Sequence, residues 1–258
     1  MAEVHVAVDT EGAVATLTFG NPARRNALSP ELRDALHDAL AAAMGDPAIR
    51  VVVLTGAAGV FCAGGDLASM AGLTPLAGRA RLQRGHRLVR LLLTGEKPVL
   101  AAVEGLAMGA GLSLAAACDI VVSARDAQWS CAFNRVGLMP DLGAAVTLPA
   151  RMGLGRARRV MLTSERFSAA QAEAWGLVEQ VVDPGTAVAT AGAIAAEIAT
   201  RAPGALALTK AWLARLPLPL EAALAAEADA QALLFATADF AEGRAAFLDK
   251  RAPRFEGR

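Results

Sequence analysis

One segment reads Lys97-Pro98-Val99-Leu100-Ala101-Ala102-Val103-Glu104-Gly105-Leu106-Ala107-Met108-Gly109-Ala110-Gly111-Leu112-Ser113, and it joins a strand pattern to a helix pattern through a glycine-rich turn. The uninterrupted apolar run over residues 98–103 is typical of a strand buried on both faces of a parallel sheet. Glycines let main-chain N–H groups approach a ligand closely, and the N-terminus of the helix predicted near 109–118 adds positive dipole character. The segment therefore predicts an α/β fold with a candidate binding loop.

Similar strand patterns recur outside this segment, and helix patterns separate them. The β-branched run at residues 50–56 again indicates a buried strand, whereas residues 4–8 and 14–19 flank a hairpin turn. Ser29-Pro30-Glu31 supplies an N-cap, a proline at the first helical position and an acid in the first turn. Because helices alternate with buried strands, we expect a largely parallel core sheet. The remaining predicted elements are a helix near residues 76–94 and a strand at 120–122.

The C-terminal part of the chain differs in character. Residues 184–250 contain no strand-like run and read as alanine-rich helices interrupted by prolines. We expect a core of about residues 1–183, followed by a helical region at residues 184–258 that serves as an oligomer contact.

Composition excludes several classes of protein. The chain of 258 residues has 25 basic and 25 acidic side chains and is 55% hydrophobic, so it can bury a substantial core and is not a disordered protein. Its balanced charge gives no general attraction to nucleic acid or to an anionic bilayer, and we expect neither partner. The most apolar stretch, residues 99–122, is interrupted by Glu104 and Asp119 and is too short to span a membrane. The N-terminal segment has no signal-peptide pattern, and the cysteines and histidines lack metal or disulfide spacing, so we expect a cytoplasmic protein without a metal site.

A second glycine-rich loop strengthens the prediction of a binding site. The segment Gly59-Val60-Phe61-Cys62-Ala63-Gly64-Gly65-Asp66-Leu67 also follows a predicted buried strand and opens into a helix. Two such loops could converge two main-chain N–H donors on one oxygen, which stabilises an enolate or a tetrahedral oxyanion. A dinucleotide site and a serine hydrolase are alternative interpretations of residues 109–113. The first lacks its third glycine and a suitably spaced acid, and the second lacks its closing glycine and a histidine motif.

The two loops and several other segments together resemble the crotonase (enoyl-CoA hydratase/isomerase) superfamily. The resemblance implies a spiral of ββα units, trimers that often pair into hexamers, and acyl-CoA thioesters as substrates. Coenzyme A enters as part of the substrate, and no separate cofactor is implied. The matching segments follow one another along nearly the whole chain, at residues 21–28, 61–67, 97–105, 118–120, 167–178 and 245–251.

Carried over position by position, the resemblance implies an oxyanion hole made by the amides of Ala63 and Ala110. The side chain of Asp66 is expected to cap the following helix, and Glu104 has no predicted role. The residues implied in binding coenzyme A are Arg24, Arg25, Ala63, Gly64, Gly65, Asp66, Leu67, Ala110, Phe247 and Lys250, of which the last two match positions that reach it from a neighbouring subunit.

The acid/base residues distinguish between reactions of the superfamily. Its hydratases use two glutamates around one water, but the matching positions hold Ser113 and Phe133, so efficient hydration is not expected. Asp141 lies in a segment, residues 137–143, that resembles members which move double bonds. One carboxylate can carry a proton between two carbons if the dienolate oxygen is held by two amides, and an apolar pocket would raise its pKa. The candidate acyl-pocket side chains are Met108, Ser113, Phe133, Leu138 and Met139.

We therefore interpret the chain as an acyl-CoA enzyme that isomerises an enoyl-CoA thioester, with Asp141 as the proton shuttle. Two other interpretations stay open: an acyl-CoA-binding protein that has lost catalysis, and a thioester hydrolase or dehalogenase that uses Asp141 as a nucleophile. An acid beside Pro140 is also typical of an ordinary helix cap. The sequence does not specify the acyl group or choose between trimer and hexamer.

Overall fold

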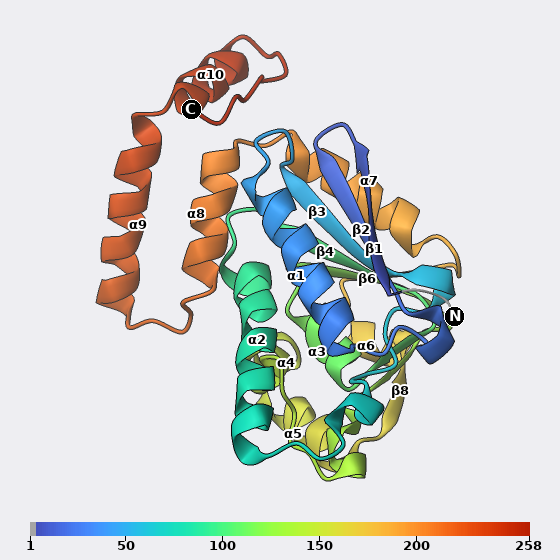
Figure 1. Cartoon of the computed structure of the whole chain (residues 1–258). Helices are drawn as coiled ribbons and strands as arrows, with labels where there is room; N and C mark the ends of the chain where they lie inside the picture. Colours follow the sequence, from blue (N-terminus) through green and yellow to red (C-terminus); the bar gives the residue numbers. More distant parts are fainter. Residues whose placement is uncertain (1–3) are drawn as a thin grey trace.

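A six-stranded sheet forms the centre of the molecule. In the computed structural model, which describes residues 4–258, its strands lie in the order β1-β2-β3-β4-β6-β9 (Figure 1). β1 and β2 form the predicted antiparallel hairpin, and each further pair of neighbours is parallel, as predicted. Residues 1–3, part of the segment considered for a signal peptide, lie outside the described residues. The strands of this sheet are β1 (His5–Glu11), β2 (Val14–Gly20), β3 (Val51–Gly56), β4 (Val99–Val103), β6 (Ile120–Ala124) and β9 (Gln180–Val182).

Both faces of this sheet are buried. Along β3, Val52 and Leu54 belong to the main core, whereas Val51 and Val53 belong to a second apolar cluster on the opposite face. This explains why the strand is apolar without alternation, as its sequence predicted. The helices are α1 (Pro30–Gly45), α2 (Pro75–Thr94), α3 (Ala110–Ala116), α4 (Ala144–Met152), α5 (Leu154–Thr163), α6 (Ala169–Ala174), α7 (Ala187–Ala199), α8 (Pro203–Leu213), α9 (Leu220–Phe235) and α10 (Ala238–Leu248).

A second, three-stranded sheet lies beside the first and carries the loops of interest. Its order is β5-β7-β8, with β5 (Leu106–Met108) parallel to β7 (Gln128–Ser130) and β8 (Arg166–Ser168) antiparallel to it. β5 leads directly into α3, so the glycine-rich turn predicted from the sequence is held between a strand and a helix. The 3-10 turn η4 (Ala132–Val136) follows β7 and leads towards Asp141.

Helix α7 extends the core past the expected boundary at residue 183. Ala187, Ala191 and Ala195 are buried against β2, β3, β4 and β6, where they close the second face of the sheet. Their small side chains let the helix backbone lie close to the sheet. The core therefore continues to the end of α7, and the boundary that we expected at residue 183 was placed too early.

The N-terminus of α7 is held by Glu104, for which the sequence suggested no role. Its Oε2 accepts a hydrogen bond from the Gly185 amide at 3.1 Å, and its Oε1 accepts one from the Ala187 amide, also at 3.1 Å. A carboxylate at this end of a helix satisfies unpaired N–H groups and complements the helix dipole. Glu104 thereby ties the end of β4 to the helix that covers the sheet.

The Glu104→Ala variant is expected to lower the free energy of unfolding by about 1–2 kcal/mol, because two amides lose their acceptor. Urea denaturation followed by circular dichroism measures this change. The matched control is Glu11→Ala, which removes an exposed glutamate at the end of β1 and should change the free energy of unfolding by less than about 0.5 kcal/mol. Equal effects of the two substitutions would argue against the cap.

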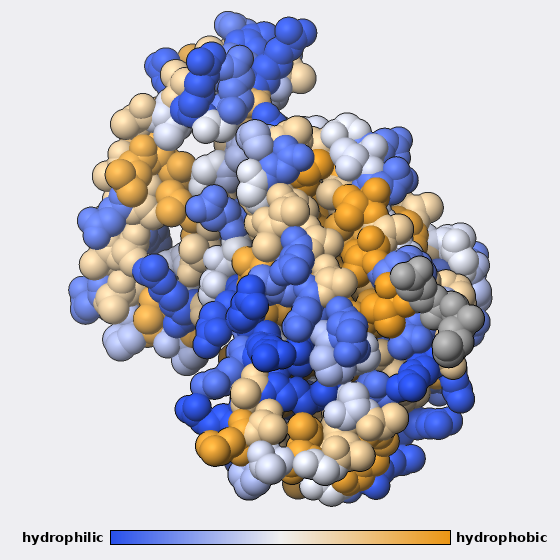
Figure 2. All heavy atoms as spheres, in the orientation of Figure 1, coloured by the Kyte–Doolittle hydropathy of each residue, from blue (hydrophilic) through white to orange (hydrophobic). Residues whose placement is uncertain are grey.

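The last three helices lead away from the sheet (Figure 1). α8 is anchored by the buried Lys210, whose Nζ lies 2.6 Å from Asp119 Oδ2 and 2.9 Å from the Lys97 carbonyl oxygen. α9 has no buried residue, and its Leu224 and Leu233 are exposed, in keeping with the apolar side chains that Figure 2 shows on this part of the surface. Across residues 4–258, no helix combines the length and apolarity needed to cross a bilayer.

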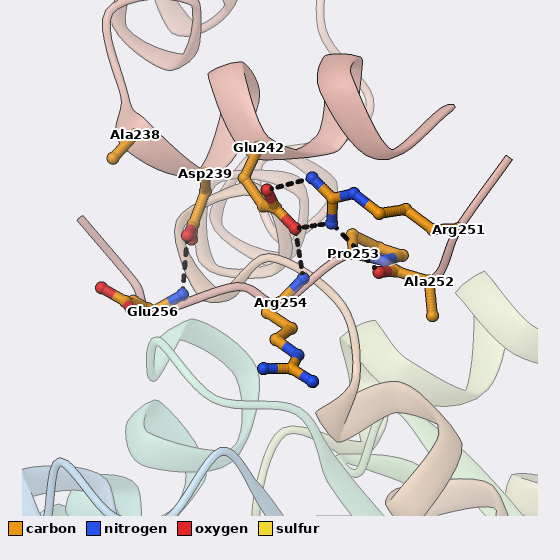
Figure 3. A pocket seen from close by; sticks show the side chains of 8 residues that line it. All are labelled: Ala238, Asp239, Glu242, Arg251, Ala252, Pro253, Arg254 and Glu256. Carbon is orange, nitrogen blue, oxygen red and sulfur yellow. Dashed lines mark hydrogen bonds and ion pairs between the residues drawn. The ribbon is translucent and has the colours of Figure 1, made fainter. Parts of the chain in front are cut away.

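A hollow of about 800 Å³ lies beside α10, and polar side chains that bind one another line it (Figure 3). Glu242 accepts hydrogen bonds from the Arg251 guanidinium and the Arg254 amide, and the Arg251 bond contributes most to lowering the pKa of Glu242 to about 2. Asp239 accepts a hydrogen bond from the Glu256 amide at 2.7 Å. These contacts fold the C-terminal tail back on α10, so the hollow is a structural feature of this end of the chain.

Candidate active site

The two glycine-rich loops lie side by side. The Cys62 amide donates to the Leu106 carbonyl at 2.8 Å, and the Met108 amide donates to the Cys62 carbonyl at 3.0 Å. Gly111 allows this approach, because a Cβ at that position would lie 2.5 Å from the Cys62 carbonyl oxygen. The two loops that we expected to converge are therefore joined by their own backbones.

A third segment, residues 21–28, is hydrogen-bonded to the glycine-rich loop at residues 59–67 and to Ala57 just before it. The Asn26 side chain is buried and donates to the Ala57 and Val60 carbonyls, and its Oδ1 accepts from the Asn21 amide. The Leu28 amide donates to the Gly64 carbonyl at 2.7 Å. This segment thus fixes the loop from outside the sheet.

A cavity of about 160 Å³ opens where the loops meet η4. It brings together many of the residues selected from the sequence, including Asp141 and both predicted oxyanion positions. Its volume is close to that of a cavity able to hold a benzene ring, about 150 Å³. The residues that line it are Ala63, Gly64, Gly65, Leu67, Met70, Gly109, Ala110, Ala132, Phe133, Val136, Leu138 and Asp141.

The main-chain amides in this cavity differ in what they bind. The Ala63 amide donates to the Arg25 carbonyl at 3.0 Å, so its hydrogen is already used within the chain. Within residues 4–258, the amides of Gly65 and Ala110 donate to no acceptor. Ala110 is the first residue of α3, where helix geometry leaves the N–H unpaired. The bond to Arg25 argues against the predicted role of Ala63, and the sequence did not indicate that the Gly65 amide would be unpaired in its place.

The Asp141 carboxylate lies at the edge of the same cavity, largely withdrawn from water. Its Oδ1 is buried without a hydrogen-bond partner in the part of the chain that the structure describes. Burial raises the pKa of Asp141 from its ordinary 3.8 to about 6, and the positive charge of Arg81 opposes this rise. The side chain does not cap α4, since Gly143 occupies the N-cap position. The helix-cap interpretation of Asp141 is therefore wrong.

The predicted acyl-pocket residues divide into two groups. Phe133 and Leu138 line the cavity, as expected. Met139 is 74% exposed, because the irregular segment before Asp141 turns its side chain to solvent. Met108 is outside the lining, and Ser113 is fully buried with its hydroxyl donating to the Gly109 carbonyl at 3.3 Å. Met108, Ser113 and Met139 are therefore outside the lining of this cavity, whereas Met70 and Val136 are lining residues that the sequence did not suggest.

The residues expected around coenzyme A fall at two places. Near the cavity, Arg24 holds Asp66 through two hydrogen bonds of 2.7 and 2.8 Å, so the Asp66 side chain binds arginine and does not cap the next helix, as we had expected. Arg25 is exposed beside this pair. Phe247, 83% exposed, and Lys250 lie at α10, at the opposite end of the molecule from α5 (Figure 1). Within one chain they do not reach the cavity.

The cysteine beneath the first loop is not an activated nucleophile. Cys62 is buried, and desolvation raises the pKa of its thiol to about 11. Among residues 4–258 no three histidine, cysteine or acidic side chains gather to hold a metal ion. The groups in the cavity lining that can act on a substrate are therefore the Asp141 carboxylate and unpaired main-chain amides, those of Gly65 and Ala110 among them.

The sequence profile of the enoyl-CoA hydratase/isomerase family matches residues 9–258. The chain belongs to this family. It is 39% identical to a 1,2-epoxyphenylacetyl-CoA isomerase of Escherichia coli, over 96% of this chain and 97% of that protein. It is 34% identical to a crotonyl-CoA hydratase of Syntrophomonas wolfei, over 99% of each chain. The crystal structure of an enoyl-CoA hydratase from a Polaromonas species superimposes with a TM-score of 0.93 at 38% identity, covering 97% of this chain and 99% of that one.

These similarities confirm the predicted fold, an α/β crotonase fold of ββα units with C-terminal helices. They also make the chain an acyl-CoA enzyme of the enoyl-CoA hydratase/isomerase family. Relatives at comparable identity carry both isomerase and hydratase names. The choice between the two reactions therefore depends on the side chains in the cavity.

Proposed function

We propose that this enzyme moves a carbon–carbon double bond in a short acyl-CoA thioester. Asp141 removes a proton from the α-carbon of a 3-enoyl thioester, the negative charge passes to the thioester oxygen, and the same carboxylic acid returns the proton to the γ-carbon. Two main-chain amides hold the oxygen while it is negative. The proton starts and ends on carbon, so the product differs from the substrate only in the place of the double bond.

The observation that carries this proposal is the single carboxylate of the cavity. Asp141 is the only acid among the lining residues that the structure describes, and its Oδ1 is buried without a partner. A desolvated, unpaired carboxylate is a stronger base than one in water. The similarity to a relative that is named an isomerase also supports isomerisation as the reaction.

Hydration is less well supported, although several relatives are named hydratases. Adding water needs one group to activate the water and another to deliver a proton to carbon. Phe133 has no titratable group, and Ser113 directs its hydroxyl to the Gly109 carbonyl. One carboxylate suffices for a proton that leaves and returns to the same molecule, so isomerisation fits the lining better.

The proposed oxyanion hole consists of the amides of Gly65 and Ala110. This replaces the Ala63 amide expected from the sequence, because the Ala63 hydrogen is bonded to the Arg25 carbonyl. Coenzyme A is proposed to run along residues 63–67 past Arg24 and Arg25, whose positive charges suit its phosphates.

The test is conversion of a 3-enoyl-CoA, such as 3-hexenoyl-CoA, to its conjugated 2-enoyl isomer. The conjugated product absorbs where the substrate does not, so purified protein gives a direct rate. Mass spectrometry of the product distinguishes isomerisation, which leaves the mass unchanged, from hydration, which adds one water. Hydration of a 2-enoyl-CoA at a comparable kcat/KM would overturn the proposal.

The pH dependence of kcat/KM should reflect Asp141. The base acts in its ionised form, and its folded pKa is raised to about 6. We expect kcat/KM to be level above about pH 7 and to fall about tenfold per pH unit below about pH 5.5. A profile that stays level down to about pH 4.5, where an unperturbed aspartate is still mostly ionised, would indicate a different base or a solvated carboxylate.

The C-terminal helices are proposed to form the contact of a trimer or a pair of trimers. α9 buries nothing within its own chain, and Leu233 on it is 66% exposed. We expect analytical ultracentrifugation to give a particle of three or six 26.4 kDa chains, and Leu233→Asp to dissociate it. Loss of the contact should also weaken coenzyme A binding, if Phe247 and Lys250 reach a neighbour's site. A wild-type monomer at micromolar concentration would contradict this assembly.

A further inference from the structure

A small inner cavity opens from the active-site cavity on the side of Asp141 that faces α1 and α2. It measures about 40 Å³ and shares Asp141, Gly65 and Ala110 with the active-site cavity. Its remaining wall includes the side chains of Arg33 and Arg81. The volume is near the share of a single water molecule in the liquid, about 30 Å³, so it has room for one small polar group.

The two arginines differ in whether their donors are used. Arg33 is buried and donates to Asp34 Oδ1 at 2.9 Å and to the Arg81 carbonyl at 3.1 Å, which joins α1 to α2. In residues 4–258, the Arg81 guanidinium donates to no acceptor and forms no ion pair. The neighbouring Asp66 is already held by Arg24. Arg81 therefore places a guanidinium with unpaired donors in the wall of the inner cavity.

We propose that Arg81 is a specificity-determining residue that binds a neutral oxygen on the distal part of the acyl chain. The inference rests on the proposed function, because it takes the acyl group to lie beside Asp141. Arg81 is half-buried, and a purely hydrocarbon chain end in this cavity would displace water from the side of the guanidinium that faces it and leave the donors on that side unpaired, which is unfavourable. A keto, ether or hydroxyl oxygen accepts the hydrogen bond and removes that penalty.

The charges around the inner cavity favour a neutral oxygen over a carboxylate. Asp141 shares the cavity and must be ionised to act as a base. A second carboxylate in the same small cavity would repel the Asp141 carboxylate and raise the pKa of Asp141. At neutral pH less of Asp141 would then be in its ionised, reactive form. The positive charge of Arg33 does not fully offset this repulsion, because it is already paired with the Asp34 carboxylate. The inferred substrates are therefore oxygenated, uncharged short acyl-CoA thioesters.

The test is calorimetric binding of saturated thioesters at pH 8, since these cannot isomerise and Asp141 is ionised at that pH. The probes are hexanoyl-CoA, 5-oxohexanoyl-CoA, 6-hydroxyhexanoyl-CoA and the half-thioester of adipic acid. We expect at least one of the two oxygenated neutral probes to bind about tenfold more tightly than hexanoyl-CoA, as for a hydrogen bond to a charged donor. In Arg81→Met this preference should fall to about onefold.

The matched control is Arg84→Met, which removes an exposed arginine one turn further along α2 and should keep the preference. Because the readout is a ratio of two affinities, a general loss of affinity in a variant does not imitate the effect. Equal binding of the neutral probes and hexanoyl-CoA, a preference that persists in Arg81→Met, or tightest binding of the adipic half-thioester would each overturn the inference. Failure of the enzyme to isomerise any enoyl-CoA would overturn the proposed function and leave these binding ratios interpretable.

Discussion

The Asp141→Asn variant is expected to lose about 10²- to 10⁴-fold in kcat for isomerisation of 3-hexenoyl-CoA, while its affinity for the thioester changes little. Asparagine has nearly the shape of aspartate but cannot take up and return a proton. No second acid lines the cavity in the described part of the chain, so no neighbour can replace the lost base. The measurement is the rate of appearance of the conjugated isomer, beside calorimetric binding of a saturated thioester.

The variant separates catalysis from folding. At pH 7 the folded protein holds a desolvated carboxylate whose pKa is raised to about 6, which opposes folding at that pH. A neutral amide removes this charge, so Asp141→Asn should unfold at a Tm no lower than that of the wild type at pH 7. Asp126→Asn, which changes an exposed aspartate outside the cavity lining, is the control and should retain kcat.

Each alternative reading gives a different result in this experiment. If the wild type and Asp141→Asn both bind thioesters and neither converts any enoyl-CoA, the chain is a binding protein. If Asp141→Asn keeps wild-type turnover, the proton shuttle lies elsewhere. An acyl group trapped on Asp141 of the wild type, detected by mass spectrometry of its peptide, would indicate a nucleophile and overturn the shuttle.

The central strands were predictable because a strand that is buried on both faces has apolar residues at consecutive positions instead of alternating ones. Residues 51–54 and 99–103 are apolar at consecutive positions, and the structure divides those positions between two cores. The extent of the core was not predictable in the same way. Alanine-rich helices read alike whether they pack on a sheet, as α7 does, or bury nothing within the chain, as α9 does. Only the partner surface distinguishes them.

The candidate site was predictable to the level of its loops, and less so for individual atoms. A glycine-rich turn after a strand indicates available amides, but which amide is free depends on bonds to residues distant in sequence. The Arg25 carbonyl accepts the hydrogen bond of the Ala63 amide, and no feature of the sequence of residues 59–67 predicts this bond. Side-chain direction in the irregular segment before Asp141 was also hidden, since Leu138 lines the cavity and Met139 faces solvent.

The position of Ala110 offers a way to delete one donor of the proposed oxyanion hole without changing the helix. Ala110 is the first residue of α3, where proline is well tolerated because no intrahelical bond uses the N–H. The preceding Gly109, at φ 51° and ψ −114°, is not helical and has no Cβ to clash with a following proline ring. Ala110→Pro is therefore expected to fold with a Tm close to that of the wild type.

Ala110→Pro should lower kcat for isomerisation by about 10²- to 10³-fold, because the negative oxygen keeps only the Gly65 amide. Ala110→Gly retains the N–H, so its kcat for isomerisation should fall far less than that of Ala110→Pro. Raman spectroscopy of a bound thioester separates donor loss from crowding by the ring: two amides should lower the carbonyl stretching frequency in the wild type and in Ala110→Gly, and most of this shift should vanish in Ala110→Pro. Because the enolate carries its charge on this oxygen, a frequency and a rate that both stay unchanged in Ala110→Pro would remove Ala110 from the oxyanion hole.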